Sequence, residues 1–202
     1  MSGVGRERFE QRWGGGVVGI GAADVARLVG AVDVPDALAV RHREQALEWL
    51  SGTEDVFRRE KPATPAPHLV SYVVPTDPST GRVLLVRHRR AGLWLPPGGH
   101  VEPGEHPADA ARREVVEELA VGRPRLLDDG RPRFLTWNLT VGPDEHVDVS
   151  LWFRLDLADG TVPAWDAAEI SAARWWSAEQ VRAAPAEGFD RHLPRFLASV
   201  EG

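Results

Sequence analysis

The stretch LPPGGHVEPGEHPADAARREVVEELAV, residues 95–121, decides the fold class of this chain. Proline suits the first turn of a helix and no helix breaker follows it, so we predict a helix over residues 107–121. Glu114, Glu117 and Glu118 stand at positions i, i+3 and i+4 and share one face of that helix. Like charges at this spacing destabilise a helix by about 0.2–0.5 kcal/mol per pair. The cluster therefore calls for a cation.

Residues on both sides of the cluster indicate which cation it is. Arg113 can neutralise only part of the charge, whereas a hard divalent ion prefers several oxygen ligands, which favours Mg²⁺ or Mn²⁺ over Zn²⁺. Gly98 and Gly99 allow a tight turn that exposes a carbonyl or amides. Glu102 and Glu105 add two loop carboxylates. Such a metal can activate water and neutralise phosphate oxygens, so the residue chemistry points to attack on a phosphoanhydride.

The same segment resembles the Nudix box, a motif of glycine, glutamate, Arg-Glu, Glu-Glu and apolar positions at fixed intervals. The matching residues are Gly99, Glu105, Arg113, Glu114, Val115, Glu117, Glu118 and Val121. The resemblance covers about residues 66–200. It implies an α/β fold, a Nudix-type α/β/α sandwich with a mixed sheet.

The resemblance also implies a reaction: metal-dependent hydrolysis of a nucleoside diphosphate linked to another moiety, with Mg²⁺ or Mn²⁺ as cofactor. The metal ligands that it implies are Gly98, Glu114, Glu117 and Glu118. It implies that Arg113 orients these glutamates and that Glu105 supports them from behind. The general base varies in the family; we favour Glu114, with Glu169, six residues before Trp175, as the competitor.

The chain departs from the family motif at Ala120, which occupies the place of the second glycine. A left-handed residue here would cost alanine about 1 kcal/mol or more. Gly122 could end the helix instead. We therefore expect a slightly extended helix rather than lost activity, because no ligand is missing.

Residues outside the motif are candidates for substrate contacts. Arg87 and Arg89 belong to the basic run 87–90, which follows a strand and could meet phosphates, or could simply be an exposed strand end. Candidates for stacking on a base are Trp94, Trp137 and Trp152, with core or interface packing as the alternative for each. Trp152 is the most suggestive because it lies on the polar face of the alternating strand 146–157.

Markers of substrate choice are absent or ambiguous. Relatives that prefer ADP-ribose carry a proline near the position of Thr136, and dinucleoside-polyphosphate hydrolases carry a tyrosine where this chain has Trp137. We therefore favour a nucleoside triphosphate, with ADP-ribose or a nucleotide sugar as alternatives. A non-catalytic nucleotide-sensing module is the rival from another class, and the retained glutamates count against it.

The chain divides at the Pro-rich segment KPATPAP, residues 61–67. We expect a mostly helical N-terminal extension over residues 1–62 and a Nudix domain over residues 66–202. In the extension a short helix is expected at 22–29 and an amphipathic helix between 35 and 60, with Thr53 capping a further turn. The remaining expected elements are strands at 68–74, 82–87, 131–141 and 146–157 and closing helices at 178–184 and 192–200.

Composition excludes several classes of protein. The 202 residues carry a formal net charge of −6, which disfavours binding to a nucleic acid polymer, although not to a nucleotide. Without cysteine there is no disulfide framework, thiolate zinc site or cysteine nucleophile. No apolar run reaches membrane-spanning length and no signal peptide is visible, so we expect no membrane association and a cytoplasmic location. Because Nudix proteins commonly pair, a homodimer is one expected arrangement.

Overall fold

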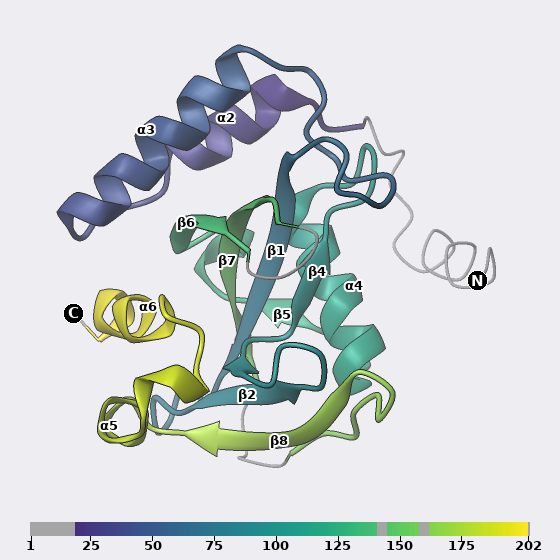
Figure 1. The fold of residues 1–202 in the computed structure, drawn as a ribbon. Helices are drawn as coiled ribbons and strands as arrows, with labels where there is room; N and C mark the ends of the chain where they lie inside the picture. The colour runs from purple at the N-terminus through teal and green to yellow at the C-terminus, as the bar shows by residue number, and fades with distance from the viewer. Residues whose placement is uncertain (1–18, 141–144, 158–161, 202) are drawn as a thin grey trace.

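The computed structural model describes residues 19–140, 145–157 and 162–201. A mixed sheet forms its centre, with helices on both faces (Figure 1). The strands are β1 (Pro67–Thr76), β2 (Val83–His88), β3 (Trp94–Leu95), β4 (Gly98–His100), β5 (Arg125–Leu126), β6 (Phe134–Leu139), β7 (Val147–Asp156) and β8 (Ile170–Trp176). The helices are α2 (Ala22–Gly30), α3 (Ala37–Ser51), α4 (Pro107–Leu119), α5 (Ala178–Ala183) and α6 (Leu193–Val200), with 3-10 turns η1 (Asp128–Gly130) and η2 (Ala186–Gly188).

Strand β1 lies at the centre of the sheet. It pairs in parallel with β7, from Pro67 opposite Val147 to Thr76 opposite Asp156. It also pairs antiparallel with β2 and with the short β4. Antiparallel pairs add β3 and β8 to β2, and β5 and β6 to β7. The expected α/β fold with a mixed sheet is confirmed.

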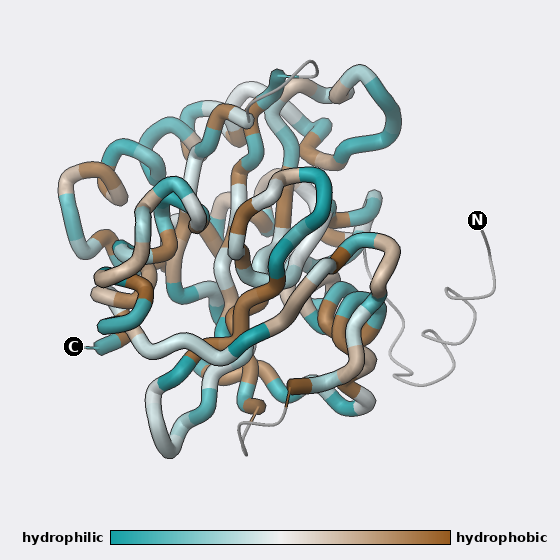
Figure 2. The backbone as a smooth tube through the Cα atoms, turned by 60° about the horizontal axis from the view of Figure 1, so that its bottom comes forward, coloured by the Kyte–Doolittle hydropathy of each residue, from teal (hydrophilic) through white to brown (hydrophobic). Residues whose placement is uncertain are grey.

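The two faces of the sheet carry separate cores because side chains alternate along each strand. Leu69 and Val73 of β1 pack toward α4, α2 and α3 in the larger core. Val74 packs on the opposite face, in the core closed by α5 and α6. Figure 2 shows apolar residues concentrated in the interior strands and polar residues in the outer loops. Both faces are therefore covered, as an α/β/α sandwich requires.

The helical part that precedes the sheet is built as two helices. Asp36 caps α3: its Oδ1 accepts a hydrogen bond from the Ala39 amide at 2.7 Å, and its carboxylate also binds the Arg195 guanidinium of α6. These hydrogen bonds from Arg195, the largest cause, lower the pKa of Asp36 to about 2. Buried side chains of α2 and α3 belong to the same core as β1. Residues 1–18 of the expected extension lie outside the described residues.

Two local expectations are corrected here. The further helical turn capped by Thr53 is wrong: the Thr53 Oγ1 accepts from the Asp55 amide in a tight turn, and Val56 and Phe57 are buried from a loop. The polar face expected for strand 146–157 is buried near its centre, because α6 covers it. Within the described residues, no helix is long and apolar enough to cross a membrane.

Candidate active site

Helix α4 carries the site and begins where its sequence requires. His106 is the N-cap, and its Nδ1 accepts a hydrogen bond from the Ala108 amide at 3.1 Å. Pro107 follows in the first turn, where a missing amide hydrogen costs nothing. Ser71 of β1 donates from its Oγ to the Pro107 carbonyl at 2.8 Å, which ties the start of the helix to the sheet. The helix therefore presents its glutamates at a fixed position against β1 and β4.

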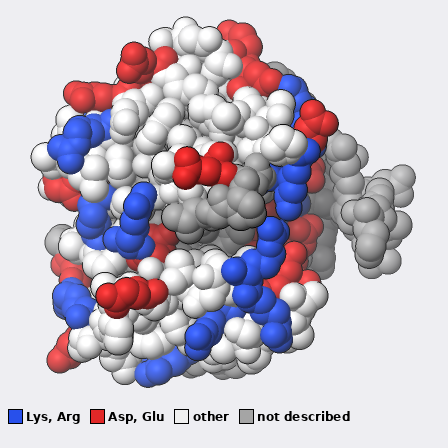
Figure 3. Space-filling model, viewed as in Figure 1, with Lys and Arg blue, Asp and Glu red and all other residues white. Residues whose placement is uncertain are grey.

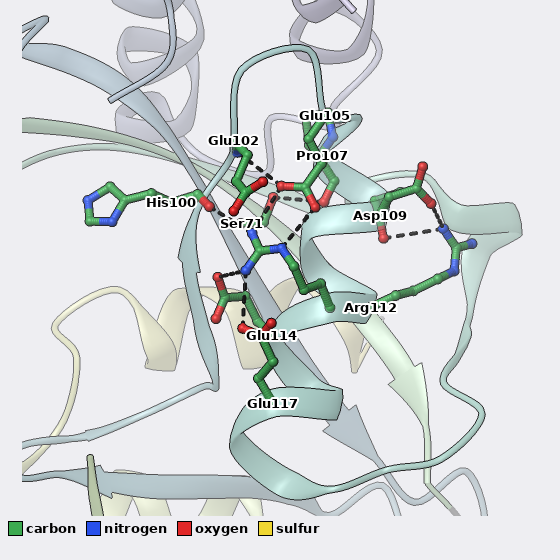
Figure 4. A network of polar contacts seen from close by, with 11 residues as sticks. Ser71, His100, Glu102, Glu105, Pro107, Asp109, Arg112, Glu114 and Glu117 are labelled. Carbon is green, nitrogen blue, oxygen red and sulfur yellow. Dashed lines mark hydrogen bonds and ion pairs between the residues drawn. The ribbon is translucent and has the colours of Figure 1, made fainter. Parts of the chain in front are cut away.

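Arg113 holds the acidic side chains together, and Figure 4 shows Glu105, Glu114 and Glu117 gathered in this network. Its Nε and Nη2 donate to the two carboxylate oxygens of Glu105 at 2.9 and 3.0 Å. Its Nη1 donates to Glu114 Oε1 at 2.6 Å and to Glu117 Oε2 at 3.4 Å. Its Nη2 also donates to the His100 carbonyl of β4 at 3.0 Å. One guanidinium thus fixes three carboxylates and a strand, in the arrangement expected for Arg113 and Glu105.

Two of the glutamates are buried without enough positive charge. The side chain of Glu114 is 12% exposed, whereas that of Glu117 is 57% exposed. Burial raises the pKa of Glu114 to about 7, although Arg113 opposes the shift. Burial, and next the charges of Glu114 and Glu169, raise the pKa of Glu118 to about 8. A bound cation would relieve both carboxylates, since it favours their charged form.

The glycines beside the helix are required by close approach. A Cβ on Gly99 would lie 2.4 Å from Glu114 Oε1, and a Cβ on Gly98 would lie 2.3 Å from the Ser71 carbonyl. The Gly98 amide also hydrogen-bonds the Glu118 carboxylate. A Cβ at Gly98 would thus meet the backbone of β1, whereas a Cβ at Gly99 would displace the Glu114 carboxylate.

An open cleft of about 360 Å³ contains this arrangement. The residues that line it are His88, Gly98, Gly99, His100, Glu102, Arg113, Glu114, Glu118 and Glu169. Glu169 reaches the cleft because its loop is anchored at both ends: the Asp166 amide donates to the Glu118 carbonyl at 2.8 Å, and the Arg89 amide donates to the Glu169 carbonyl at 2.8 Å. The structure therefore brings the favoured base, Glu114, and its competitor, Glu169, into one cleft.

The donor set fits a hard divalent ion. Glu114 and Glu118 supply a largely buried and a buried carboxylate to the cleft, where Gly98 lies beside them. Glu117 is outside the lining and accepts a hydrogen bond from Arg113. All of these ligand atoms would be oxygens, which suits Mg²⁺ or Mn²⁺. The cleft lining thus contains three of the four ligands implied by the sequence, Gly98, Glu114 and Glu118, and Glu117 is the most exposed of the three glutamates.

Ala120 behaves differently from the expectation. Helix α4 ends at Leu119, and Ala120 adopts the left-handed conformation, with φ 50° and ψ 28°. The expected extension toward Gly122 is wrong. Alanine takes the backbone conformation that glycine would take because the Ala120 amide still closes the helix on the Val116 carbonyl.

The sequence-predicted substrate contacts lie elsewhere. Among the described residues, the lining of the cleft includes none of Arg87, Arg89, Trp94, Trp137 and Trp152. Arg87 is exposed on β2, and Arg89 donates from its Nε to the Ala167 carbonyl at 2.9 Å, so it holds the Glu169 loop. Trp94 packs edge-on against Trp176, and Trp137 against Trp49.

The base-stacking role of Trp152 is wrong. Its ring is fully buried, stacks on Phe196 of α6 and meets Phe134 edge-on. Its Nε1 donates to Thr136 Oγ1 at 3.2 Å, which satisfies its polar atom inside the core. The ring therefore has no free face for a base.

The cleft also contains two histidines. His88 belongs to the basic run 87–90, which the sequence marks as a possible phosphate contact. His100 directly follows the two glycines, and the sequence does not mark it because the motif leaves that position unspecified.

Charges over the rest of the surface are mixed. On the face shown in Figure 3, basic side chains form a band at the lower right that acidic side chains flank. No uniformly positive face appears in this view, in agreement with the net charge of −6.

Comparison with known proteins agrees with this geometry. The NUDIX domain model matches residues 66–197. The chain is 33% identical over 141 residues to the NAD-capped RNA hydrolase ndx-9 of Caenorhabditis elegans, covering 63% of this chain and 34% of that protein. It is 28% identical over 131 residues to the m7GpppN-mRNA hydrolase NUDT17 of Danio rerio, covering 52% of this chain and 40% of that protein. The chain thus spans about a third to two fifths of the length of these curated relatives.

A solved structure shows the same fold. The dihydroneopterin triphosphate pyrophosphohydrolase of E. coli matches with a TM-score of 0.54 and 23% identity, covering 72% of this chain and 97% of that one. The matched region contains the sheet and α4, with all the box glutamates in place. The chain belongs to the Nudix family.

Proposed function

We propose that this protein uses Mg²⁺ or Mn²⁺ to hydrolyse a phosphoanhydride bond of a nucleoside triphosphate. The observation that carries the proposal is the pair of buried carboxylates, Glu114 and Glu118, facing one cleft beside Gly98 and Gly99. Burying two neighbouring carboxylates is unfavourable unless a cation joins them. A polyphosphate then finds neutralising charge at a site that is acidic on its own.

The metal would be held by Glu114, Glu117 and Glu118, with the Gly98 carbonyl as a further ligand. When bound, it supplies a neutralising charge for phosphate oxygens and lowers the pKa of a water molecule. Arg113 is a positioning residue, because its guanidinium fixes Glu114 and Glu117. Glu105 in turn holds the guanidinium of Arg113 in place. The Gly98 amide holds the Glu118 carboxylate in place.

The proton acceptor for the attacking water is Glu114 in this proposal, with Glu169 as the competitor. Glu114 Oε1 accepts from Arg113, and the raised pKa of about 7 suits a group that takes a proton near neutral pH. Glu169 is exposed and lines the same cleft from the opposite loop. Glu114→Gln and Glu169→Gln are compared with metal affinity measured in each, because Glu114 is also a proposed metal ligand. Loss of the base removes the rise of kcat with increasing pH.

Substrate choice rests on the cleft and the relatives. The E. coli structural neighbour acts on a triphosphate, and the C. elegans and Danio rerio relatives act on capped RNA. Within the cleft lining as described, no Phe, Tyr or Trp ring is present to stack on a base, so phosphate recognition carries the proposal. A triphosphate supplies the most charge for such a site. ADP-ribose and a nucleotide sugar remain alternatives, and a small nucleotide is preferred over a nucleic acid polymer.

The test is a panel of nucleoside triphosphates, ADP-ribose, nucleotide sugars and NAD-capped RNA with Mg²⁺ and with Mn²⁺, followed by identification of the products. We expect metal-dependent release of pyrophosphate or phosphate from triphosphates. Glu114→Gln should lower kcat by about 10²-fold or more. Glu179→Gln, on the exposed face of α5, is the matched control and should leave kcat unchanged.

Two outcomes would contradict the proposal. Turnover of ADP-ribose or capped RNA with no turnover of triphosphates would overturn the substrate class. The sensing module would be favoured by two results together: the wild-type protein turns over no nucleotide, and the Glu117→Gln variant binds the nucleotide as tightly as the wild type does.

A further inference from the structure

A second group of ligand-capable side chains lies on the face of the sheet opposite α4. It consists of His68 on β1, His100 on β4, His146 just before β7 and Asp148 on β7. One ligand atom from each of the four residues lies within 4.8 Å of the others. His68 is fully buried, His146 and Asp148 are partly buried, and His100 is exposed, so the group has a route to solvent. We call these four residues the histidine cluster.

Strand register brings the histidine cluster together. His68 lies directly opposite Asp148 in the parallel pairing of β1 with β7. His100 lies opposite Val70, two residues along β1 from His68 and on the same face. His146 precedes Asp148 by two residues. Three strands (β1, β4 and β7), adjacent in Figure 1, thus point one side chain each at a common centre, with His146 beside it.

The hydrogen bonds of His68 leave a lone pair pointing at a carboxylate. Its Nδ1 lies 3.0 Å from the Pro65 carbonyl, which can only accept, so Nδ1 carries the hydrogen. In the neutral ring, Nε2 is then an acceptor. That Nε2 lies 3.2 Å from Asp148 Oδ1, which is also an acceptor. Among the described residues neither buried atom has a hydrogen-bond partner.

Two acceptors facing one another need a positive charge between them. Asp148 Oδ1 also lies 3.2 Å from His146 Nε2, so one carboxylate oxygen meets two imidazole nitrogens. A proton on His68 Nε2 would also join it to Asp148, as an imidazolium whose ring lies 4.8 Å from that of His146 and 4.9 Å from that of His100. A neutral His146 could donate from its Nε2 to the same oxygen. One metal ion satisfies all the lone pairs at once.

The geometry points to a binding site for one Zn²⁺-class transition-metal ion, with His68, His146 and Asp148 as its ligands and His100 as the fourth. Three imidazoles and one carboxylate suit a borderline ion rather than Mg²⁺. The outer contacts are of the kind that orient such ligands: the Pro65 carbonyl holds His68 Nδ1, and Thr140 Oγ1 lies 3.3 Å from His146 Nδ1. Four protein ligands close the coordination sphere, so the ion is structural.

One residue, His100, connects the proposed ion site with the catalytic cleft. The carbonyl of His100 accepts from Arg113 Nη2 at 3.0 Å, so the end of β4 is shared by the histidine cluster and the glutamate network. Arg58 Nη1 lies 2.9 Å from His100 Nε2 and competes with a metal for that nitrogen. Fixing β4 from its second face would hold Gly98 and Gly99 steady beside the glutamates.

The test measures metal binding rather than activity. The full chain carrying Glu114→Gln and Glu118→Gln removes the buried acidic ligands and serves as the host. Zn²⁺ is titrated against a chromophoric chelator, and Co²⁺ is added for its visible absorption. We expect one equivalent of Zn²⁺ and the intense absorption of four-coordinate Co²⁺. His146→Gln or Asp148→Asn in this host should weaken binding more than about tenfold.

Matched controls make the outcome specific. His88→Gln alters a histidine of the cleft outside the histidine cluster and should leave Zn²⁺ affinity unchanged. Arg58→Gln should tighten it, because it removes the competitor for His100. Equal affinity in the host, Asp148→Asn and His146→Gln would overturn the proposal.

A measurement on the unaltered protein needs no variant to fold. In nitrogen-15 spectra of the imidazoles, addition of Zn²⁺ should shift His68 Nε2 and His146 Nε2 while both Nδ1 keep their hydrogens. Both nitrogens of His68 protonated, with no response to Zn²⁺, would show an imidazolium–carboxylate pair and overturn the metal site.

Discussion

The glutamate network on α4 and the histidine cluster occupy opposite faces of the same strands, and they differ in how the chain builds them. The network comes from one continuous segment, with Glu114, Glu117 and Glu118 within a single helical turn. The histidine cluster comes from positions 68, 100, 146 and 148, which meet only through strand register. The first is hard and oxygen-rich, the second rich in imidazole. A sequence motif can predict the glutamate network, whereas the histidine cluster can be found only in the three-dimensional structure.

The largest expected effect is a loss of kcat from a substitution that disturbs the glutamate network and leaves the histidine cluster unchanged. Gly99→Ala places a Cβ 2.4 Å from Glu114 Oε1, and a displacement of about 1 Å in such a group can cost about 100-fold in kcat. Measured kcat should fall by that order, while Zn²⁺ affinity of the histidine cluster stays within a factor of a few.

Gly122→Ala is the matched control for this change. A Cβ there meets nothing within 4 Å, so kcat should be unchanged. Equal losses in both variants would show that the close approach of β4 to Glu114 is unimportant.

The next effect is the pH dependence of the free energy of unfolding that the carboxylates of the glutamate network cause. Burial raises the pKa of Glu118 to about 8 and that of Glu114 to about 7, whereas the ordinary pKa of both carboxyls is 4.5. Between these limits the folded state binds more protons than the unfolded state, so the free energy of unfolding falls as pH rises. Without divalent ions the slope should approach about 1.4 kcal/mol per pH unit for each proton.

Mg²⁺ should recover the lost stability at pH 8, because it binds the charged carboxylates. Thermal unfolding from pH 5 to 8, with and without Mg²⁺, measures this. Glu118→Gln should flatten the slope. A metal-free protein that gains stability over this range would contradict the burial of these carboxylates.

A smaller effect concerns the joint between β1 and α4. Ser71→Ala removes the hydrogen bond to the Pro107 carbonyl, which is buried, and should lower the free energy of unfolding by about 1 kcal/mol. Urea unfolding checks the stability. Zn²⁺ binding should not change, because Ser71 and His68 point to opposite faces; a parallel loss of Zn²⁺ affinity would show that the two faces are coupled through β1.

The smallest effect is a gain. Ala120→Gly relieves the left-handed conformation at the end of α4 and should stabilise the protein by about 0.5–1 kcal/mol. Denaturant midpoints measure it, with kcat as the control that should not move. A loss of stability would mean that Ala120 makes a contact worth more than its backbone strain.

How far the sequence predicts this molecule depends on the length over which a signal repeats. The helix predicted at 107–121 is found at Pro107–Leu119, and the alternating strand predicted at 146–157 is found at Val147–Asp156. The two- and three-residue strands β3, β4 and β5 carry too few residues for a periodic pattern. They form because long neighbours offer them partners.

The site divides along the same line. Arg113 contacts Glu105, Glu114 and Glu117 because one helix and one loop carry these residues, and their roles in the reaction stay predictions. The prediction that Trp152 stacks on a base was wrong. The alternation of β7 indicates two faces, but it does not indicate that α6 covers the second face. Arg89 uses its Nε to hold a loop carbonyl, and its contact with phosphate stays a prediction. Such tertiary contacts have no signal in a single sequence.

The alternation of β1 has a consequence for how errors in folding would be felt. Ser71 faces α4 while His68 faces Asp148, and both orientations depend on the same pairing with β7. A slip of one residue in that pairing would turn every side chain of β1 to the wrong face. The glutamate network and the histidine cluster would then be lost together. A chain in which one of them has formed therefore already has the strand register that the other requires.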